Sequence, residues 1–139
     1  EDAAVFFASN GISRIGGRYF KCLYIAYTDA TFSAKAPTQA KWQHLGFLGP
    51  ALHAEVGDSM TVSFKNLCTK NASINVAAVL KPKEHEGWHY EDGTTTGSGV
   101  VPPGGTHTYE WQVIDGPGPL DSSSIGFLYY SHQPMHTGT

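Results

Sequence analysis

Two stretches of the chain alternate strictly between apolar and polar residues. In the first, Met60, Val62 and Phe64 alternate with threonine, serine and lysine. Residues 106–113 alternate in the same way. Successive side chains of a β-strand point to opposite faces of the sheet, so a period of two is typical of a strand that buries one face. We therefore predict a half-buried strand in each stretch.

Four further segments favour β-structure with weaker patterns. Residues 19–27 are rich in β-forming residues, and residues 51–56 are predicted as a short strand before a Gly-Asp turn. The apolar run at 73–80 is short enough to be a buried strand, and residues 125–131 are predicted as the last strand.

Glycine and proline mark the connections between these segments. Residues 81–105 contain Pro-Pro and Gly-Gly pairs and are predicted as a long loop, and the Gly-Pro-Gly-Pro sequence at 116–119 is a turn. Residues 1–17 form an irregular lead-in. We find no internal repeat and no helix of normal length. The pattern therefore indicates one all-β domain over residues 18–139, a sandwich or barrel.

Composition narrows the class of protein further. The chain has 139 residues, which suffices for one domain with one core. Its net charge is only −3 and it contains no basic run, which disfavours nucleic acid or an anionic membrane surface as a partner. No apolar run approaches the roughly 20 residues needed to cross a bilayer. We therefore expect no nucleic acid partner and no membrane span.

Five motifs, in a fixed order, resemble those of one known family. They are Trp42–Pro50, Ala54–Asp58, Lys83–Gly87, Val101–Trp111 and Tyr129–His132. Together they resemble the ceruloplasmin, hephaestin and coagulation factor V and VIII family, and in particular an odd-numbered middle domain of ceruloplasmin. The resemblance covers nearly the whole chain. It implies a cupredoxin-like (plastocyanin-like) Greek-key β-sandwich or barrel.

One strand of that fold has no counterpart in the sequence. Domains of the family continue past the Ser-His segment into a Gly-Leu-Ile-Gly-Pro strand that closes the barrel, whereas this chain stops at Thr139. A missing strand leaves unpaired N–H and C=O groups on its neighbour. We expect the sequence to be a piece of a longer polypeptide, or else to be completed by a strand from a protein partner.

The resemblance also points to the positions that hold copper in oxygen-reducing relatives. Paired His-x-His motifs provide the imidazole ligands there. In this chain the first motif falls on Asn75–Ala77 and the second on Tyr130–His132, so only His132 is retained. The other copper type of the family needs a cysteine thiolate, and residues 122–131 contain none. We expect no catalytic residue and no cofactor in this chain, with copper in other domains of a parent protein.

Two histidines near the end of the chain are weak candidates for a surface metal site. His132 and His136 are four residues apart, with Met135 beside them. Pro134 and Gly138 disfavour the helix that would align the two rings. The favoured interpretation is a solvated terminal loop.

Residues 85–89 match the His-Glu-x-x-His signature of zinc proteases. That chemistry requires both histidines on one face of a helix, together with a third ligand. Here Gly87 lies inside the motif, Pro82 precedes it, and Asp92 and Gly93 follow. We therefore predict that residues 85–89 are not helical and have no protease function.

The two cysteines and one glycosylation sequon bear on the cellular compartment in which the protein is found. Asn71-Ala72-Ser73 is an acceptor sequence for N-glycosylation, which matters only in a secreted protein. The resemblance and the sequon together favour an extracellular setting, in which Cys22 and Cys68 are expected to pair. The alternative is two free, buried thiols. The cysteine that relatives carry near Ser124 is absent, so their usual disulfide cannot form.

These observations support a main hypothesis and two alternatives. The main hypothesis is a structural, non-catalytic cupredoxin-like domain of a secreted ceruloplasmin- or hephaestin-like multicopper ferroxidase. The first alternative is a copper-free extracellular interaction module akin to the coagulation cofactors. The second is an assembly subunit completed by a partner strand.

Overall fold

The computed structural model describes residues 21–88, 90–91 and 98–133, and the described chain is almost entirely strands, turns and loops. Two short 3-10 helices accompany the strands. In chain order the elements are η1 (Ala40–Leu45), β1 (Ser59–Lys65), β2 (Asn75–Val76), β3 (Val79–Leu80), η2 (Lys83–His85), β4 (Thr106–Val113) and β5 (Tyr129–Tyr130). The predicted all-β class is confirmed.

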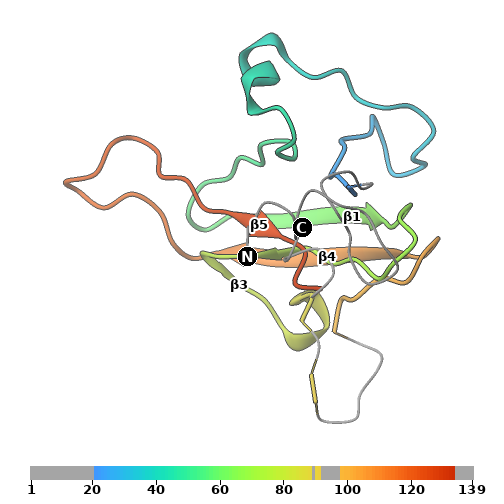
Figure 1. Ribbon diagram of the computed structural model, residues 1–139. Coiled ribbons are helices and arrows are strands. Elements are labelled where there is room, and N and C mark those ends of the chain that lie inside the picture. Colours follow the sequence, from blue (N-terminus) through green and yellow to red (C-terminus); the bar gives the residue numbers. More distant parts are fainter. Residues whose placement is uncertain (1–20, 89, 92–97, 134–139) are drawn as a thin grey trace, which may run out of the picture.

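The main sheet has three antiparallel strands in the order β1-β4-β3. Strands β1 and β4 pair along their whole length, with Val62 opposite Tyr109 and Phe64 opposite His107 (Figure 1). Both strands lie in the two alternating stretches, and their apolar residues face the interior as that pattern predicted. The two strongest strand predictions are therefore confirmed.

A second sheet consists of β2 and β5, which pair antiparallel although they are far apart in the sequence. The core lies between the two sheets. Ile74, Tyr109 and Trp111 are its buried centre, and Val76 and Tyr129 from the second sheet pack against them. The remaining half-buried partners are Tyr24, Met60, Val62, Phe64 and Val79. The fold is thus a small sandwich around an aromatic core.

Tyr109 ties the core to two loops. Its side chain is 0 % exposed. The hydroxyl accepts a hydrogen bond from the Ile74 backbone N–H (3.0 Å) and donates one to the Gly99 carbonyl. Burial raises the pKa of the Tyr109 phenol to about 12. The phenol therefore stays protonated at physiological pH and keeps donating to Gly99.

The apolar run at 73–80 forms two strands instead of the single one predicted. Its first half is β2 in the second sheet, and its second half is β3 in the main sheet. Ala78 lies between them with a φ of 66°, a left-handed conformation that turns the chain. The chain changes sheets at this point, so one straight strand is impossible.

Three other expectations are also corrected. Residues 51–56 form no strand and are mostly exposed, because no neighbouring strand pairs with them among the described residues. Among the described residues of the segment predicted as β-rich, 21–27, only Tyr27 makes a β-bridge, to Lys35. The last strand is limited to Tyr129–Tyr130, since residues 125–128 are exposed and unpaired within the described chain. Apolar content alone does not make a strand where a pairing partner is lacking.

Candidate functional site

The second sheet brings together the two segments that the resemblance aligns with the His-x-His motifs of oxygen-reducing domains. Asn75 on β2 lies directly opposite Tyr130 on β5, and Val76 lies opposite Tyr129. Ala77 and His132 follow these strands. The two aligned segments therefore pair as strands, but their side chains differ from the expected copper ligands.

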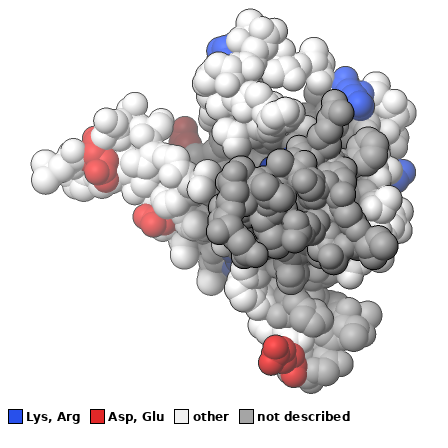
Figure 2. Space-filling model, in the orientation of Figure 1, with Lys and Arg blue, Asp and Glu red and all other residues white. Residues whose placement is uncertain are grey.

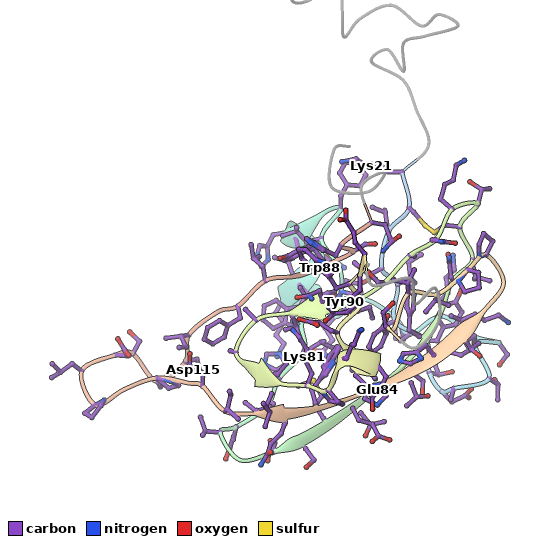
Figure 3. The ribbon with its side chains drawn as sticks, turned by 90° about the horizontal axis from the view of Figure 1, so that it is seen from below. Lys21, Lys81, Glu84, Trp88, Tyr90 and Asp115 are labelled. Carbon is purple, nitrogen blue, oxygen red and sulfur yellow. A yellow bond between two sulfur atoms is a disulfide. The ribbon has the colours of Figure 1, made fainter. Side chains whose placement is uncertain are left out.

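A lysine is bound at the first motif. The Asn75 amide nitrogen donates a hydrogen bond to the Glu86 carbonyl (2.7 Å), while the Lys81 Nζ donates to the Asn75 Oδ1 (3.4 Å) and to the Val76 carbonyl. Figure 3 labels Lys81 in the segment that follows β3. Burial lowers the pKa of Lys81, and the Glu86 carboxylate opposes that change. A bound ammonium group repels a metal cation at this position.

His132 is the one histidine retained at these positions, and its ring lies against Trp88. The two ring centroids are 3.1 Å apart with planes 30° apart, and Tyr130 approaches the imidazole edge-on at 5.8 Å. Burial lowers the pKa of His132, and Glu86 again acts in the opposite direction. Its Nδ1 is buried and has no hydrogen-bond partner within the described chain. His136 lies outside the described residues.

Two serines fix the backbone beside His132. The Ser73 N–H donates to the Ser131 Oγ (3.2 Å), and the His132 N–H donates to the Ser73 Oγ (3.1 Å). The Tyr24 hydroxyl donates to the Ser73 carbonyl. These hydrogen bonds join three segments of the chain, so β2 and β5 are held in register by side chains as well as by their own short ladder.

The residues at these positions do not fit a copper cluster. They provide one imidazole, together with an asparagine that is already hydrogen-bonded, an alanine and a tyrosine. Copper sites of this kind need several imidazoles, and a blue-copper site also needs a thiolate. The described chain contains no group of three or more His, Cys, Asp or Glu residues that could hold a metal ion. No copper-dependent step is therefore assigned to this site.

One residue of the zinc-protease signature is helical, contrary to the prediction. η2 covers Lys83–His85, so the prediction that residues 85–89 are not helical is wrong at His85 and is confirmed at residues 86–88. The turn ends because Gly87 has a φ of 73°, and a Cβ at Gly87 would lie 2.7 Å from the Ile74 carbonyl oxygen. His89 lies outside the described residues. The left-handed residue interrupts the α-helix that the protease motif requires.

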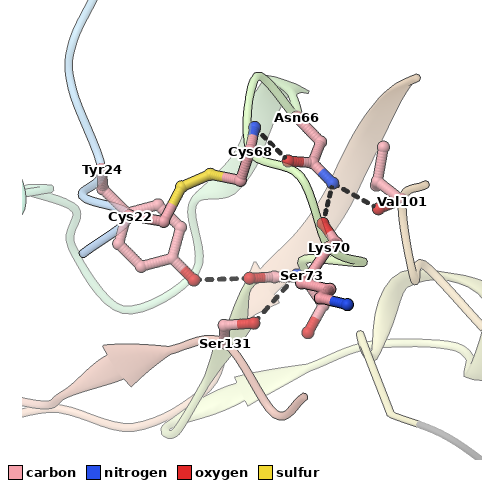
Figure 4. The surroundings of a disulfide bond; sticks show 8 residues. All are labelled: Cys22, Tyr24, Asn66, Cys68, Lys70, Ser73, Val101 and Ser131. Atoms are coloured by element: carbon pink, nitrogen blue, oxygen red, sulfur yellow. Dashed lines mark hydrogen bonds between the residues drawn. A yellow bond between two sulfur atoms is a disulfide. The ribbon is translucent and has the colours of Figure 1, made fainter. Parts of the chain in front are cut away.

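The structure pairs the two cysteines close to the main sheet. Cys22 and Cys68 form a disulfide with a Cα–Cα distance of 6.1 Å, and the buried Asn66 side chain lies beside it (Figure 4). Asn71 is exposed a few residues further on. The disulfide thus connects the N-terminal described segment to the loop after β1.

Two residues of potential function were not predicted from the sequence. His107 on β4 lies within hydrogen-bonding distance of His85, and Lys81 fills the first ligand position. Neither stands at a recognisable motif spacing. Their partners are set by the packing of η2 and β3 on β4, which alternation along one strand does not reveal.

Two small antiparallel sheets pack around an aromatic core, as in a cupredoxin-like all-β domain. The sequence profile of the multicopper oxidases matches residues 24–138, and the chain belongs to this family.

Individual relatives agree with this assignment. The chain is 39% identical over 134 residues to Ferroxidase HEPHL1 of Homo sapiens, a match that covers 93% of this chain and 11% of that protein. Ceruloplasmin of Ovis aries is 41% identical over 137 residues, with 93% of this chain and 13% of that protein covered. Hephaestin of Homo sapiens is 37% identical over 131 residues, with 91% and 11% covered. The chain thus spans about an eighth of the length of these relatives.

On the face drawn in Figure 2, the lysine, aspartate and glutamate side chains of the described residues appear as separate patches among uncharged residues. Within the described residues, no helix combines the length and the apolar character needed to traverse a bilayer.

Proposed function

We propose that this chain is a copper-free, architectural domain of a larger, extracellular ferroxidase-like protein whose copper is held by other domains. This proposal rests on the hydrogen-bonded asparagine at the first copper-ligand position, Asn75. Asn75 is hydrogen-bonded to Glu86 and Lys81, and Tyr130 stands opposite it, at positions that the resemblance aligns with the imidazoles of oxygen-reducing domains. The fold of a copper domain is kept while its ligand set is replaced, which favours a role in positioning neighbouring domains.

Exposed apolar side chains support contact with other domains. Phe47 is 81 % exposed and Leu48 is 66 % exposed just after η1, and Leu120 and Leu128 are largely exposed between β4 and β5. Figure 1 shows η1 and the orange segment between β4 and β5 extending away from the sheets. Burying one such side chain contributes about 1.5–3 kcal/mol. Neighbouring domains that cover these residues would therefore stabilise the assembly.

The same exposed residues, together with the edges of the sheets, favour a second candidate function. β1 lies at the edge of its sheet, and the second sheet has only two strands in the described chain. A strand added at an edge by another protein would pair its free N–H and C=O groups. A copper-free interaction module is the alternative that this observation supports. Fe(II) oxidation by the full polypeptide distinguishes the two, because an interaction module lacks it.

The extracellular setting predicts a glycan at Asn71. Asn71 is exposed, and the nearby disulfide is stable only in an oxidising compartment. We expect the secreted protein to migrate faster after endoglycosidase treatment, and the Asn71→Gln variant to lose the glycopeptide that carries this site. The Ser73 side chain is buried, so Asn71→Gln is a cleaner change than a substitution of Ser73. An unmodified Asn71 in protein secreted by glycosylating cells would contradict the proposal.

The architectural role predicts that His132 is dispensable for iron oxidation. In the full polypeptide, His132→Ala should leave the copper content and the steady-state rate of Fe(II) oxidation within about twofold of wild type, because one imidazole cannot complete a cluster. Tyr130→Phe is the matched control, since it changes the neighbouring position while keeping an aromatic ring. Loss of one or more copper ions from a correctly folded His132→Ala variant would overturn the proposal.

A further inference from the structure

His85 and His107 come together from different elements outside the copper-ligand positions. His85 ends η2, and His107 lies on β4. The His85 Nδ1 and the His107 Nε2 are 3.1 Å apart, and both side chains are half-buried. η2 is fastened to β4 because the Trp111 Nε1–H donates to the His85 carbonyl (3.0 Å). One nitrogen of each imidazole therefore faces the other ring, and η2 and β4 hold the two histidines in place.

Surrounding groups fix the orientation of the His107 ring. It packs edge-on against Tyr109 with ring centroids 4.6 Å apart. A backbone hydrogen bond with Glu84 stabilises the protonated form of the ring, so the ring donates there. An imidazole that donates through one nitrogen to a carbonyl has its other nitrogen directed at a ligand, an arrangement typical of metal-binding histidines.

The separation of the two facing nitrogens matches that of two ligands on one metal ion. With Zn–N bonds of about 2.0–2.1 Å, adjacent nitrogens lie roughly 2.9 Å apart at a right angle and roughly 3.4 Å apart in a tetrahedron. The observed 3.1 Å lies between these values. We propose that His85 and His107 form a binding site for a divalent transition-metal ion of borderline softness, namely Zn²⁺.

Binding requires both facing nitrogens to be unprotonated. In the free pair, one ring donates a hydrogen bond to the other, and metal binding moves that proton to the far nitrogen of the same ring, so no proton is gained or lost. Burial, and secondly His85, lower the pKa of His107, which favours this neutral form. Among the described residues this site has two protein ligands, because no third His, Cys, Asp or Glu completes a group there.

Residue-level protection tests the proposal in the full polypeptide, without disturbing any copper it holds. Histidines are modified with diethyl pyrocarbonate with and without micromolar Zn²⁺, and each site is quantified by peptide mass spectrometry. We expect Zn²⁺ to slow the modification of both His85 and His107 at least tenfold. The exposed His53 serves as the internal control and should react at the same rate in both conditions.

A substitution separates metal binding from a simple hydrogen bond. In His107→Gln, Zn²⁺ should no longer protect His85, and if that variant does not fold, His85→Gln should equally abolish the protection of His107. Unchanged modification of both histidines in the wild type would overturn the proposal, as would equal protection of His85 in His107→Gln. In those cases the pair is only a hydrogen bond.

Discussion

Replacing both Cys22 and Cys68 by serine should lower the free energy of unfolding by about 4 kcal/mol. The disulfide joins residues 46 positions apart, and a cross-link of that length removes about 4 kcal/mol of chain entropy from the unfolded state. The buried core is small, with Ile74, Tyr109 and Trp111 at its centre, so little other stabilisation is available. Urea unfolding followed by tryptophan fluorescence measures the difference.

Reduction of the wild type provides the matched control for the disulfide. With a reducing agent present, the wild type should unfold at the same urea concentration as the double-serine variant, because both lack the cross-link. A loss below about 1 kcal/mol would show that the unfolded chain gains little freedom when the disulfide is removed. That result would contradict a stabilising role for the cross-link.

The second large effect is expected for Asn66→Ala, with a loss of about 3–5 kcal/mol. The Asn66 side chain is 0 % exposed. Its Nδ2 donates to the Lys70 and Val101 carbonyls, each at 2.8 Å, and its Oδ1 accepts from the Cys68 N–H at 2.9 Å. Alanine leaves these three backbone groups without their partner; the bond to Val101 is buried and the other two are partly buried. A fully buried unpaired group costs about 1–3 kcal/mol.

Two further variants make the Asn66 experiment specific. Asn66→Asp keeps an acceptor for Cys68 but loses both donors and places a charge in the interior, so it should be at least as unstable as Asn66→Ala. Asn71→Ala, at an exposed position five residues on, should change stability by less than about 0.5 kcal/mol. Thermal unfolding by circular dichroism compares the set. An Asn66→Ala variant that melts with the wild type would show that water replaces the amide.

Strand prediction succeeded where alternation and pairing coincide. β1 and β4 each carry a regular period of two, and they pair with each other over their whole length, so local pattern and tertiary structure agree. The prediction of a single strand at 73–80 was wrong because the chain passes from one sheet to the other at Ala78. The predicted strand at 51–56 is absent because these residues have no partner strand among the described residues. These outcomes depend on contacts that a local pattern does not contain.

The candidate site shows the same division. The resemblance placed Asn75 and Tyr130 at matching positions, and the structure pairs them. It did not reveal that Lys81 binds Asn75 or that His85 meets His107. Both contacts arise from the way η2 and β3 pack against β4, which a motif on one segment cannot specify.

We propose that this chain serves as one copper-free domain of a larger protein. The intact mass of the denatured, reduced and deglycosylated polypeptide isolated from its natural source tests this proposal. We expect a mass several times the 15.0 kDa of this chain, because other domains of the polypeptide would hold the copper. A mass near 15.0 kDa would contradict it and leave a free-standing chain without copper domains to organise.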